Sequence, residues 1–314
     1  RMPLGTDRVA QIWRAMNPEV VIQRVAVKTP NTYAPDFATG PLDFYFYTAA
    51  FKGIERESGL EIYFGIPMQD LSVVPTEDGA QVVYLERGVA IYDASDREVH
   101  RVRHEMPLRL KGVVDRSAGA FIPEMDRVEL SPGNYRLAVQ VTDRSSGKSQ
   151  VYNQNRIVKG YGGESLMLSD IELAGSIEVA DEARFQKGDV AVVPMASKAY
   201  LPGQPVFIYY EIYNLKRDEF GATKYRVSYE VRSLERKSIG ARILGGFGNL
   251  LDQRKERGII TIEYEQIGSE SDEQGYLELD MSRSEPGRQL LRIKVTDENS
   301  GKSARAIARF KVQE

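Results

Sequence analysis

The sequence predicts an all-β protein made of two tandem immunoglobulin-like β-sandwich domains after a short N-terminal segment. Three observations predict this class: one stretch occurs twice, apolar residues alternate with polar ones, and the composition favours strands. The 314 residues include 17 Tyr but one Trp, with many Val and Ile. Aromatic and β-branched residues are enriched in strands. An apolar content of 42% is enough for hydrophobic cores.

The repeated stretch runs from Pro132 to Ser149 and again from Pro286 to Ser303. It consists of a Pro-Gly turn, an alternating segment and an Asp-x-x-Ser-Gly-Lys turn, and every matched pair is separated by the same 154 positions. A gapless match of this length indicates two related units.

Each copy of the repeat predicts a β-hairpin that closes its unit. Apolar residues take every second position after Pro-Gly, and another alternating run follows each turn, over 149–158 and 303–312. Such a hairpin is typical of the last strands of an immunoglobulin-like sandwich. The Gly-Lys-Ser in each turn resembles the end of a phosphate loop. That motif needs an earlier glycine where Thr142 and Thr296 stand, so we favour the turn.

The chain divides into four predicted segments. Residues 1–39 form an N-terminal segment with a short helix after Asp7 and a strand over Val20–Val27. The first sandwich occupies 40–158, a junction with the first strands of the second unit occupies 159–205, and the second sandwich occupies 206–314.

Within each unit, short alternating runs between turn residues predict the strands. In the first unit they are Phe44–Tyr47, Leu60–Ile66, Gln81–Leu85, Gly88–Tyr92, His100–Arg103 and Leu108–Val113. In the second they are Val206–Leu215, Tyr225–Val231, Ile259–Glu265 and Leu277–Leu279. Because Val206–Leu215 has large apolar residues on both faces, we expect a central strand covered on both sides.

Several of these stretches resemble a known family. Residues 168–174, 193–194 and 209–215, with the two Thr-Asp-x-x-Ser-Gly-Lys hairpins, are similar to the C-terminal part of bacterial GWxTD-domain proteins, over about residues 40–314. The resemblance implies an exported protein of a Gram-negative or related bacterium. The Gly-Trp-x-Thr-Asp signature itself is absent, since Gly5-Thr6-Asp7 has no Trp. The family provides no catalytic residues to carry over.

Composition excludes several classes of site. A net charge of −3 gives no global basic field for nucleic acid. Without cysteine there is no disulfide, zinc–thiolate site or cysteine nucleophile. No apolar run approaches the ~18 residues of a transmembrane helix. The chain begins at Arg1 rather than Met, as expected of a processed product whose export signal has been removed. We therefore expect an extracytoplasmic, periplasmic location.

No residue pattern predicts a catalytic site, a metal site or a cofactor site. His100 and His104 would lie about 13 Å apart on a strand, too far for one metal ion. Asp143, Asp170 and Asp297 are expected to cap turns through their own backbone. No Gly-x-Ser-x-Gly elbow is present. The protein is therefore predicted not to be an enzyme.

The apolar, glycine-rich stretch 238–251 does not look like sandwich scaffold. One interpretation is a long loop that folds back on its own domain. The other is a docking loop for a protein partner or a membrane surface, because exposed apolar segments serve as interaction sites. Its candidate partner-binding residues are Ile243, Leu244, Phe247, Leu250 and Leu251.

These observations predict a non-enzymatic, extracytoplasmic structural or interaction protein. We expect an accessory subunit of a larger cell-envelope or membrane-associated assembly, bound to protein partners through this loop or an exposed strand edge. One alternative is a carbohydrate-binding sandwich with an exposed row formed by Tyr45, Tyr47, Tyr209 and Tyr213. Another is the non-catalytic part of a longer hydrolase.

Overall fold

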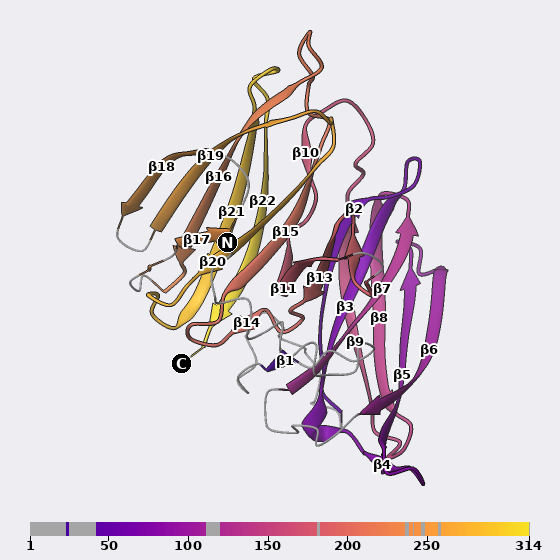
Figure 1. Ribbon diagram of the computed structural model, residues 1–314. Helices are drawn as coiled ribbons and strands as arrows, with labels where there is room; N and C mark the ends of the chain where they lie inside the picture. The colour runs from indigo at the N-terminus through magenta and orange to yellow at the C-terminus, as the bar shows by residue number, and fades with distance from the viewer. Residues whose placement is uncertain are drawn as a thin grey trace.

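The computed structural model describes residues 23–24, 42–110, 120–180, 183–235, 239–240, 242–245, 249–256 and 259–313. It describes the backbone alone for 23–24, 243–245 and 249–256. The described chain is all-β, with one short 3-10 turn and strands arranged in four sheets (Figure 1).

The first sandwich consists of sheets A and B. Sheet A has the strand order β1-β7-β3-β2, and sheet B has the order β6-β5-β8-β9, with β4 beside the start of β5. The elements are β1 (Gln23–Arg24), β2 (Tyr45–Lys52), β3 (Ser58–Pro67), η1 (Met68–Asp70), β4 (Val74–Pro75), β5 (Gln81–Tyr92), β6 (Glu98–Leu110), β7 (Ala120–Leu130), β8 (Gly133–Asp143) and β9 (Ser149–Val158).

The second sandwich consists of sheets C and D. Sheet C has the order β12-β13-β11-β15-β20-β17, with β10 beside β15, and sheet D has the order β14-β22-β21-β16-β19-β18. The first strands are β10 (Met167–Leu168), β11 (Glu172–Val179), β12 (Gln186–Lys187), β13 (Val190–Pro194), β14 (Ala199–Tyr200) and β15 (Val206–Tyr213). The remainder are β16 (Thr223–Ser233), β17 (Arg242–Gly245), β18 (Asn249–Glu256), β19 (Ile259–Gly268), β20 (Glu273–Asp280), β21 (Gly287–Asp297) and β22 (Ser303–Val312).

The repeated stretch is a β-hairpin in both units, as predicted. Strands β8 and β9 have the same bounds as β21 and β22 after a shift of 154 positions. Asp143 accepts hydrogen bonds from the backbone of Ser145 (2.9 Å) and of distant Ser72 (2.8 Å). Asp297 likewise accepts hydrogen bonds from the backbone N–H groups of Asn299 (3.0 Å) and of distant Lys216 (3.1 Å). Each carboxylate therefore caps its turn, as expected, and also ties that turn to a remote loop.

Asp170 is the third aspartate predicted to cap a turn. It instead joins two parts of the chain. Its Oδ2 atom accepts a 3.0 Å hydrogen bond from the backbone N–H of Ala50. The same atom forms an ion pair with Arg156.

Some predicted strands are parts of one longer strand. Gln81–Leu85 and Gly88–Tyr92 are both in β5, because Gly88 keeps regular pairing with β6 and β8 on either side. His100–Arg103 and the start of Leu108–Val113 are both in β6. Pro107 does not interrupt β6 because this strand ends the sheet, where proline is tolerated.

The N-terminal prediction is only partly within the described residues. Gln23–Arg24, inside the predicted strand Val20–Val27, forms β1 and pairs with β7. The predicted helix after Asp7 lies outside the described residues. Strands β10 to β14, from the predicted junction, belong to the sheets of the second sandwich.

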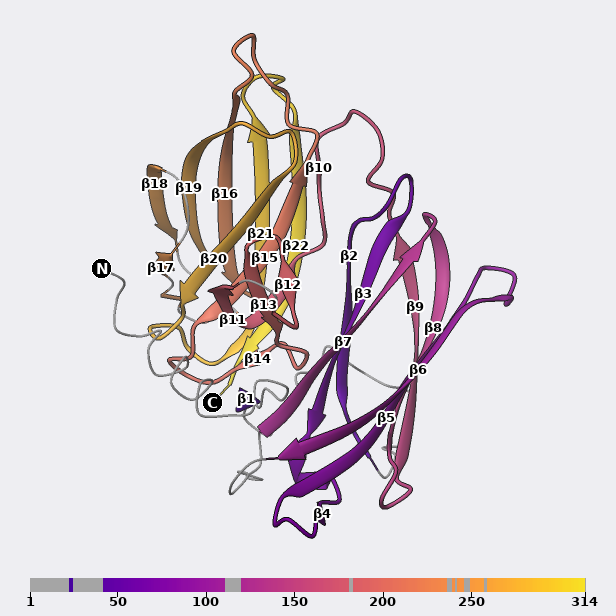
Figure 2. The ribbon, with the colours of Figure 1, turned by 45° about the vertical axis from the view of Figure 1, so that its right-hand side comes forward.

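The two sandwiches pack against each other to give four layers in the order B, A, C, D. Each sandwich has its own core, and a further apolar cluster joins sheet A to sheet C. Figures 1 and 2 both show β11 and β13 beside β2 and β3. Sheets A and C are therefore covered on both faces, and Val206–Tyr213 (β15) is the central buried strand that its sequence predicts.

A buried charged cluster crosses the interface between the sandwiches. The Nζ atom of Lys187, on β12, lies 2.6 Å from a carboxylate oxygen of Glu61 on β3 and 2.8 Å from one of Glu172 on β11. The rings of Phe51 and Tyr209 lie beside the ammonium, with centroids at 3.5 and 4.9 Å. All three charged side chains are at least nine-tenths buried. The cluster therefore links the two sandwiches through one cation.

Two buried carboxylates share Lys187, and Glu61 also forms a 3.3 Å ion pair with the half-exposed Arg127. Burial raises the pKa of Glu172 to about 7, although Lys187 opposes the change and Glu61 adds repulsion. Burial also acts against the charge of Lys187, but the two carboxylates outweigh it and raise the pKa of its ammonium. The Tyr63 hydroxyl donates a hydrogen bond to Glu61, which satisfies part of the remaining charge.

We expect Lys187→Met to lower the free energy of unfolding by about 3–5 kcal/mol, because it leaves the buried carboxylate of Glu172 without a cation and Glu61 with Arg127 alone. Urea denaturation at pH 8 measures the loss. The control is Lys148→Met in an exposed turn, which should change stability by less than about 0.5 kcal/mol. A loss below about 1 kcal/mol for Lys187→Met would contradict this role.

The raised pKa of Glu172 also predicts a pH dependence. A carboxyl with a raised pKa contributes stability that is complete below about pH 4.5 and is lost as the pH rises through about 7. Glu172→Gln keeps a neutral side chain, so we expect the mutant to gain roughly 1–3 kcal/mol relative to the wild-type protein between pH 5 and 8. Urea denaturation of both proteins across this range measures the difference between their free energies of unfolding. A difference that stays constant with pH would contradict the raised pKa of Glu172.

Candidate functional site on the outer face of sheet B

The outer face of sheet B, which points away from sheet A, is hollowed along its length. Three hollows of about 510, 260 and 390 Å³ lie on or beside this face. They follow one another from the β5–β6 turn, across the middle of the sheet, to the turn between β8 and β9. Because the other face of sheet B packs into a core, this is the face on which the first sandwich can meet a partner.

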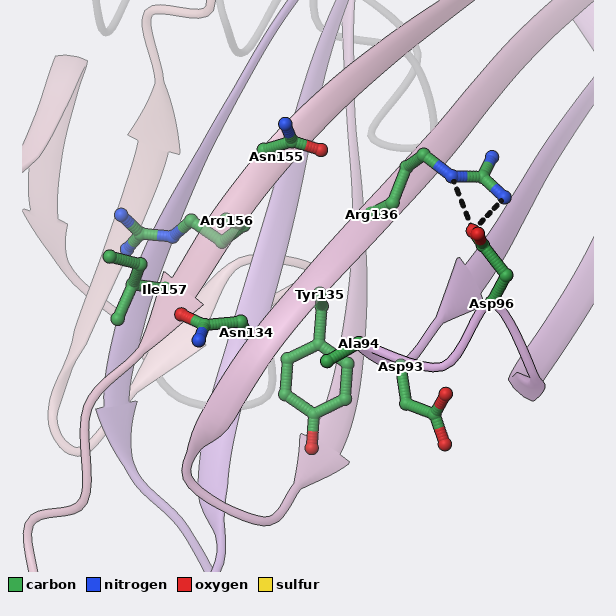
Figure 3. Close-up of a pocket in the computed structure, with 9 residues that line it drawn as sticks. All are labelled: Asp93, Ala94, Asp96, Asn134, Tyr135, Arg136, Asn155, Arg156 and Ile157. Carbon is green, nitrogen blue, oxygen red and sulfur yellow. Dashed lines mark hydrogen bonds and ion pairs between the residues drawn. The ribbon is translucent and has the colours of Figure 1, made fainter.

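The largest hollow lies at the end of the sheet (Figure 3). Most of the residues that line it are of polar type, and they come from the β5–β6 turn, β8 and β9: Asp93, Ala94, Asp96, Asn134, Tyr135, Arg136, Asn155, Arg156 and Ile157.

Two interactions fix one wall of this hollow. Arg136 points toward Asp96 and forms a 2.9 Å ion pair with it (Figure 3). The same guanidinium lies over the ring of Tyr92, 4.3 Å from the centroid. On the other wall, the Tyr135 hydroxyl donates a 2.7 Å hydrogen bond to the Ser131 carbonyl.

Asp93 supplies a fixed negative charge at the same end. Backbone hydrogen bonds from Arg97 and Ser95 lower the pKa of its carboxyl. The hollow thus offers a carboxylate, side-chain amides and a guanidinium to a polar ligand.

The central hollow exists because its floor is made of small residues. Gly88 and Ala90 on β5 and Ala138 on β8 form the floor, and Arg101 and Arg103 on β6 stand along one side. Arg103 is held there by an ion pair with Glu86, a buried carboxylate that also bonds Arg144 at 2.6 Å. The hydrogen bond from Arg103 lowers the pKa of Glu86, although burial opposes the change.

The fold does not require glycine at position 88. Its backbone is not in the left-handed region, and its pairing with both neighbours is regular. A Cβ atom there would meet only the Val102 carbonyl oxygen, at an ordinary 3.7 Å. Glycine inside a strand costs about 0.5–1 kcal/mol relative to alanine, and it often marks a place where a ligand or another backbone comes close. Gly88 is therefore the residue that most strongly indicates a binding surface.

The stretch predicted as a loop contains two strands. Ile243 and Leu244 are in β17, which pairs with β20 at one edge of sheet C. Leu250 and Leu251 are in β18, which pairs with β19 at one edge of sheet D. Phe247 and the side chains of these four residues lie outside what the structure describes. The loop interpretation is wrong for the strand residues, because both segments extend existing sheets, while partner binding there stays a prediction.

The predicted tyrosine row is not on the surface. Tyr47, Tyr209 and Tyr213 are at most 4% exposed, at the contact between the sandwiches. Tyr45 is partly buried against Phe121, with the ring centroids 5.0 Å apart. A sugar-binding row formed by these residues is therefore excluded. The sequence showed that both faces of these strands are apolar, but not that another sandwich covers the outer one.

The two histidines lie on β6. His104 is half exposed, with its Nε2 atom 3.3 Å from a carboxylate oxygen of Asp126. Among the residues that the structure describes, no group of three or more acidic or histidine side chains is arranged to hold a metal ion. No helix in the same part of the chain is long and apolar enough to span a membrane.

Sequence reasoning missed the outer face of sheet B altogether. Gly88 gave a signal, but it was placed only as the first residue of the predicted strand Gly88–Tyr92. The hollow needs Ala90, Ala138 and Arg103 beside Gly88, and only the strand register brings them together.

No protein-family model and no curated protein matches the sequence. Among solved structures, the C-terminal domain of the Streptococcus agalactiae AgI/II polypeptide BspA aligns with 87% of this chain and all of that chain, at 7% identity and a TM-score of 0.26. Alpha-2-macroglobulin of Escherichia coli, activated by porcine elastase, aligns with 90% of this chain and 22% of that chain, at 9% identity and a TM-score of 0.25. The B domain of a biofilm associated protein aligns with 91% of this chain and 88% of that chain, at 5% identity and a TM-score of 0.24. TM-scores this low do not establish a common fold or function.

We expect Gly88→Val to fill the central hollow and to raise the free energy of unfolding by about 0.5–1 kcal/mol, because valine suits a strand interior and a Cβ atom at this position meets no steric conflict. Urea denaturation of the two proteins measures the change. A clear loss of stability would show that the fold itself requires glycine at this position.

Proposed function

We propose that this chain is a non-catalytic interaction unit of an extracytoplasmic assembly. It consists of two immunoglobulin-like sandwiches and binds a protein partner across the outer face of sheet B. The arrangement of the strands supports the immunoglobulin-like assignment. Each sandwich pairs a three-stranded set, β2-β3-β7 or β11-β15-β20, with a four-stranded set, β6-β5-β8-β9 or β19-β16-β21-β22.

The central observation is the hollow over Gly88, because the duplicated unit has a larger residue at the matching place. In the first sandwich Gly88 pairs with Gln140. At the matching place in the second, Ser228 pairs with Lys294. The same scaffold therefore folds with a larger side chain at this position, so the fold does not require the small residue that forms the hollow.

The partner would place an extended segment over the hollow and along β9. This strand ends the sheet order, and an end strand can accept an added strand through its backbone. Its outward side chains include Val151 and Ile157, which are 41% and 68% exposed. Together with the small-residue floor, they give an apolar path bordered by the polar end hollow.

The rigid contact between the sandwiches suits a structural subunit. The ion pairs of Lys187 and the apolar cluster between sheets A and C hold the outer faces in a fixed relation. The location in the periplasm, the role as an accessory subunit of a cell-envelope assembly and the membership of the GWxTD-domain family stay predictions from the sequence.

Photo-crosslinking in the native cells tests this function. A photoreactive side chain at Val151, at the border of the central hollow, should give a crosslink to one protein of defined mass. Adding Gly88→Val should reduce the crosslink at least tenfold without lowering the melting temperature. The matched control, Ser228→Val in the second unit, should leave the crosslink unchanged. Crosslinking that survives Gly88→Val would place the partner elsewhere.

The polar end hollow favours carbohydrate binding as a second candidate function. Asp93, Asn134, Arg136 and Asn155 provide the donors and acceptors that a sugar needs. A glycan array with the wild-type protein and Asn155→Ala separates the two functions. A glycan bound by the wild-type protein and lost in the variant supports the sugar site, and no bound glycan excludes it.

A further inference from the structure

The outer face of sheet D, at the other end of the four layers, carries a basic surface. Six cations project outward from the adjacent strands β21 and β22, while the alternate positions enter the core. We call these residues the basic face: Arg288, Arg292, Lys294, Arg305, Arg309 and Lys311. Along β22 the positions from Arg305 to Lys311 extend about 20 Å.

The strand register brings like charges together on this face. Lys294 lies directly opposite Arg305, and Arg288 lies directly opposite Lys311. Opposed like charges on neighbouring strands are destabilising. Folding alone would therefore not favour this arrangement.

Few carboxylates neutralise the basic face. Arg292 pairs with Glu230 at 2.9 Å and Arg288 with Glu235 at 3.3 Å. The remaining four have no carboxylate within ion-pair distance among the described residues: Lys294, Arg305, Arg309 and Lys311. The protein as a whole has a net charge of −3, so this surface is a local concentration of charge rather than a result of composition.

The duplicated unit provides an internal comparison. The same hairpin in the first sandwich has identical strand bounds, and its core positions are also apolar. At the six positions that match the basic face it has no charge at all: Asn134, Ala138, Gln140, Val151, Asn155 and Ile157. The hairpin thus folds without these cations, and their presence in the second unit needs another explanation.

The environment of Lys198 supports a positive potential at the end of the basic face. Lys198 precedes β14, and its carbonyl accepts a 2.8 Å hydrogen bond from the backbone N–H of Lys311. The pKa of Lys198 is lowered to about 8, mainly by burial, with contributions from the charges of Arg156 and Arg309 that Asp170 opposes.

We propose that the basic face binds a membrane surface that carries anionic lipid headgroups. A sheet face is broad and flat, and its long cationic side chains can reach a plane of headgroups. Ile307, 52% exposed, projects from the same face of β22 between Arg305 and Arg309, where it can contact the interfacial region. None of the outward positions of β21 and β22 is aromatic, so the surface lacks the stacking groups with which proteins hold single-stranded nucleic acid.

This inference is independent of the partner proposed for sheet B, because it concerns the opposite end of the molecule. Vesicle flotation tests it with the 314-residue chain and two compositions, phosphatidylcholine alone and phosphatidylcholine with 30% phosphatidylglycerol. We expect binding only to the anionic vesicles, and weaker binding at higher salt, because ions screen such contacts.

The decisive variant carries Lys294→Gln, Arg305→Val and Arg309→Asn, which are the residues of the first unit at these positions. Each cation near an anionic surface contributes about fivefold in affinity, so the triple variant should bind about 100-fold more weakly. It should melt no lower than the wild-type protein, because an opposed pair of like charges is removed.

The matched control removes three exposed cations elsewhere: Arg56→Gln, Lys148→Gln and Lys216→Gln. It has the same net charge as the triple variant, and we expect it to bind the vesicles within about threefold of the wild-type affinity. The proposal is overturned if the wild-type protein does not bind anionic vesicles, if the triple variant binds as tightly as the wild type, or if both variants lose binding equally. Binding to a DNA duplex without binding to vesicles would also overturn it.

Discussion

The contact between sheets A and C is the constraint on which the rest of this structure depends. An ordinary sandwich has two outer faces exposed to water, but here one outer face of each sandwich is buried against the other. This contact includes Lys187 held between Glu61 and Glu172. Buried charges tolerate little change in geometry, because each carboxylate must keep a partner. The interface therefore fixes how the two sandwiches lie, and it leaves sheets B and D as the outer layers.

The duplication explains why the two outer layers can be compared position by position. The hairpins β8–β9 and β21–β22 share their bounds, their core pattern and an aspartate that caps the turn and bonds a distant loop. These features maintain the scaffold. Many outward positions are free of that requirement. The six positions that form the basic face on sheet D are all neutral on sheet B. A residue difference at a position that the fold does not constrain is therefore better evidence of function than a feature that both units share.

The two outer faces also have different physical character. The face of sheet B is hollowed over Gly88, with a floor of small residues bordered by Arg101 and Arg103, which suits contact with a shaped partner. The face of sheet D is cationic along β22, which suits a ligand with distributed negative charge. A rigid stack with such faces at its two ends can hold one partner at a fixed distance from another. This arrangement needs no catalytic group, and the buried titratable residues of the interface are used to join the sandwiches.

The sequence by itself determined the class of fold, the two units and the closing hairpins. Alternation with a period of two is a local property of each stretch, and comparing the sequence with itself reveals the repeat at 154 positions. It also placed Val206–Tyr213 in the centre of a sheet, because both of its faces are apolar. Only the tertiary structure decided what covers those faces. Tyr47 and Tyr209 are equally consistent with a sugar-binding surface and with a domain interface until the second sandwich is in place. The ion pairs of Lys187, the hollow over Gly88 and the opposed charges of Lys294 and Arg305 likewise depend on pairing between residues far apart in the chain, which a single sequence does not specify.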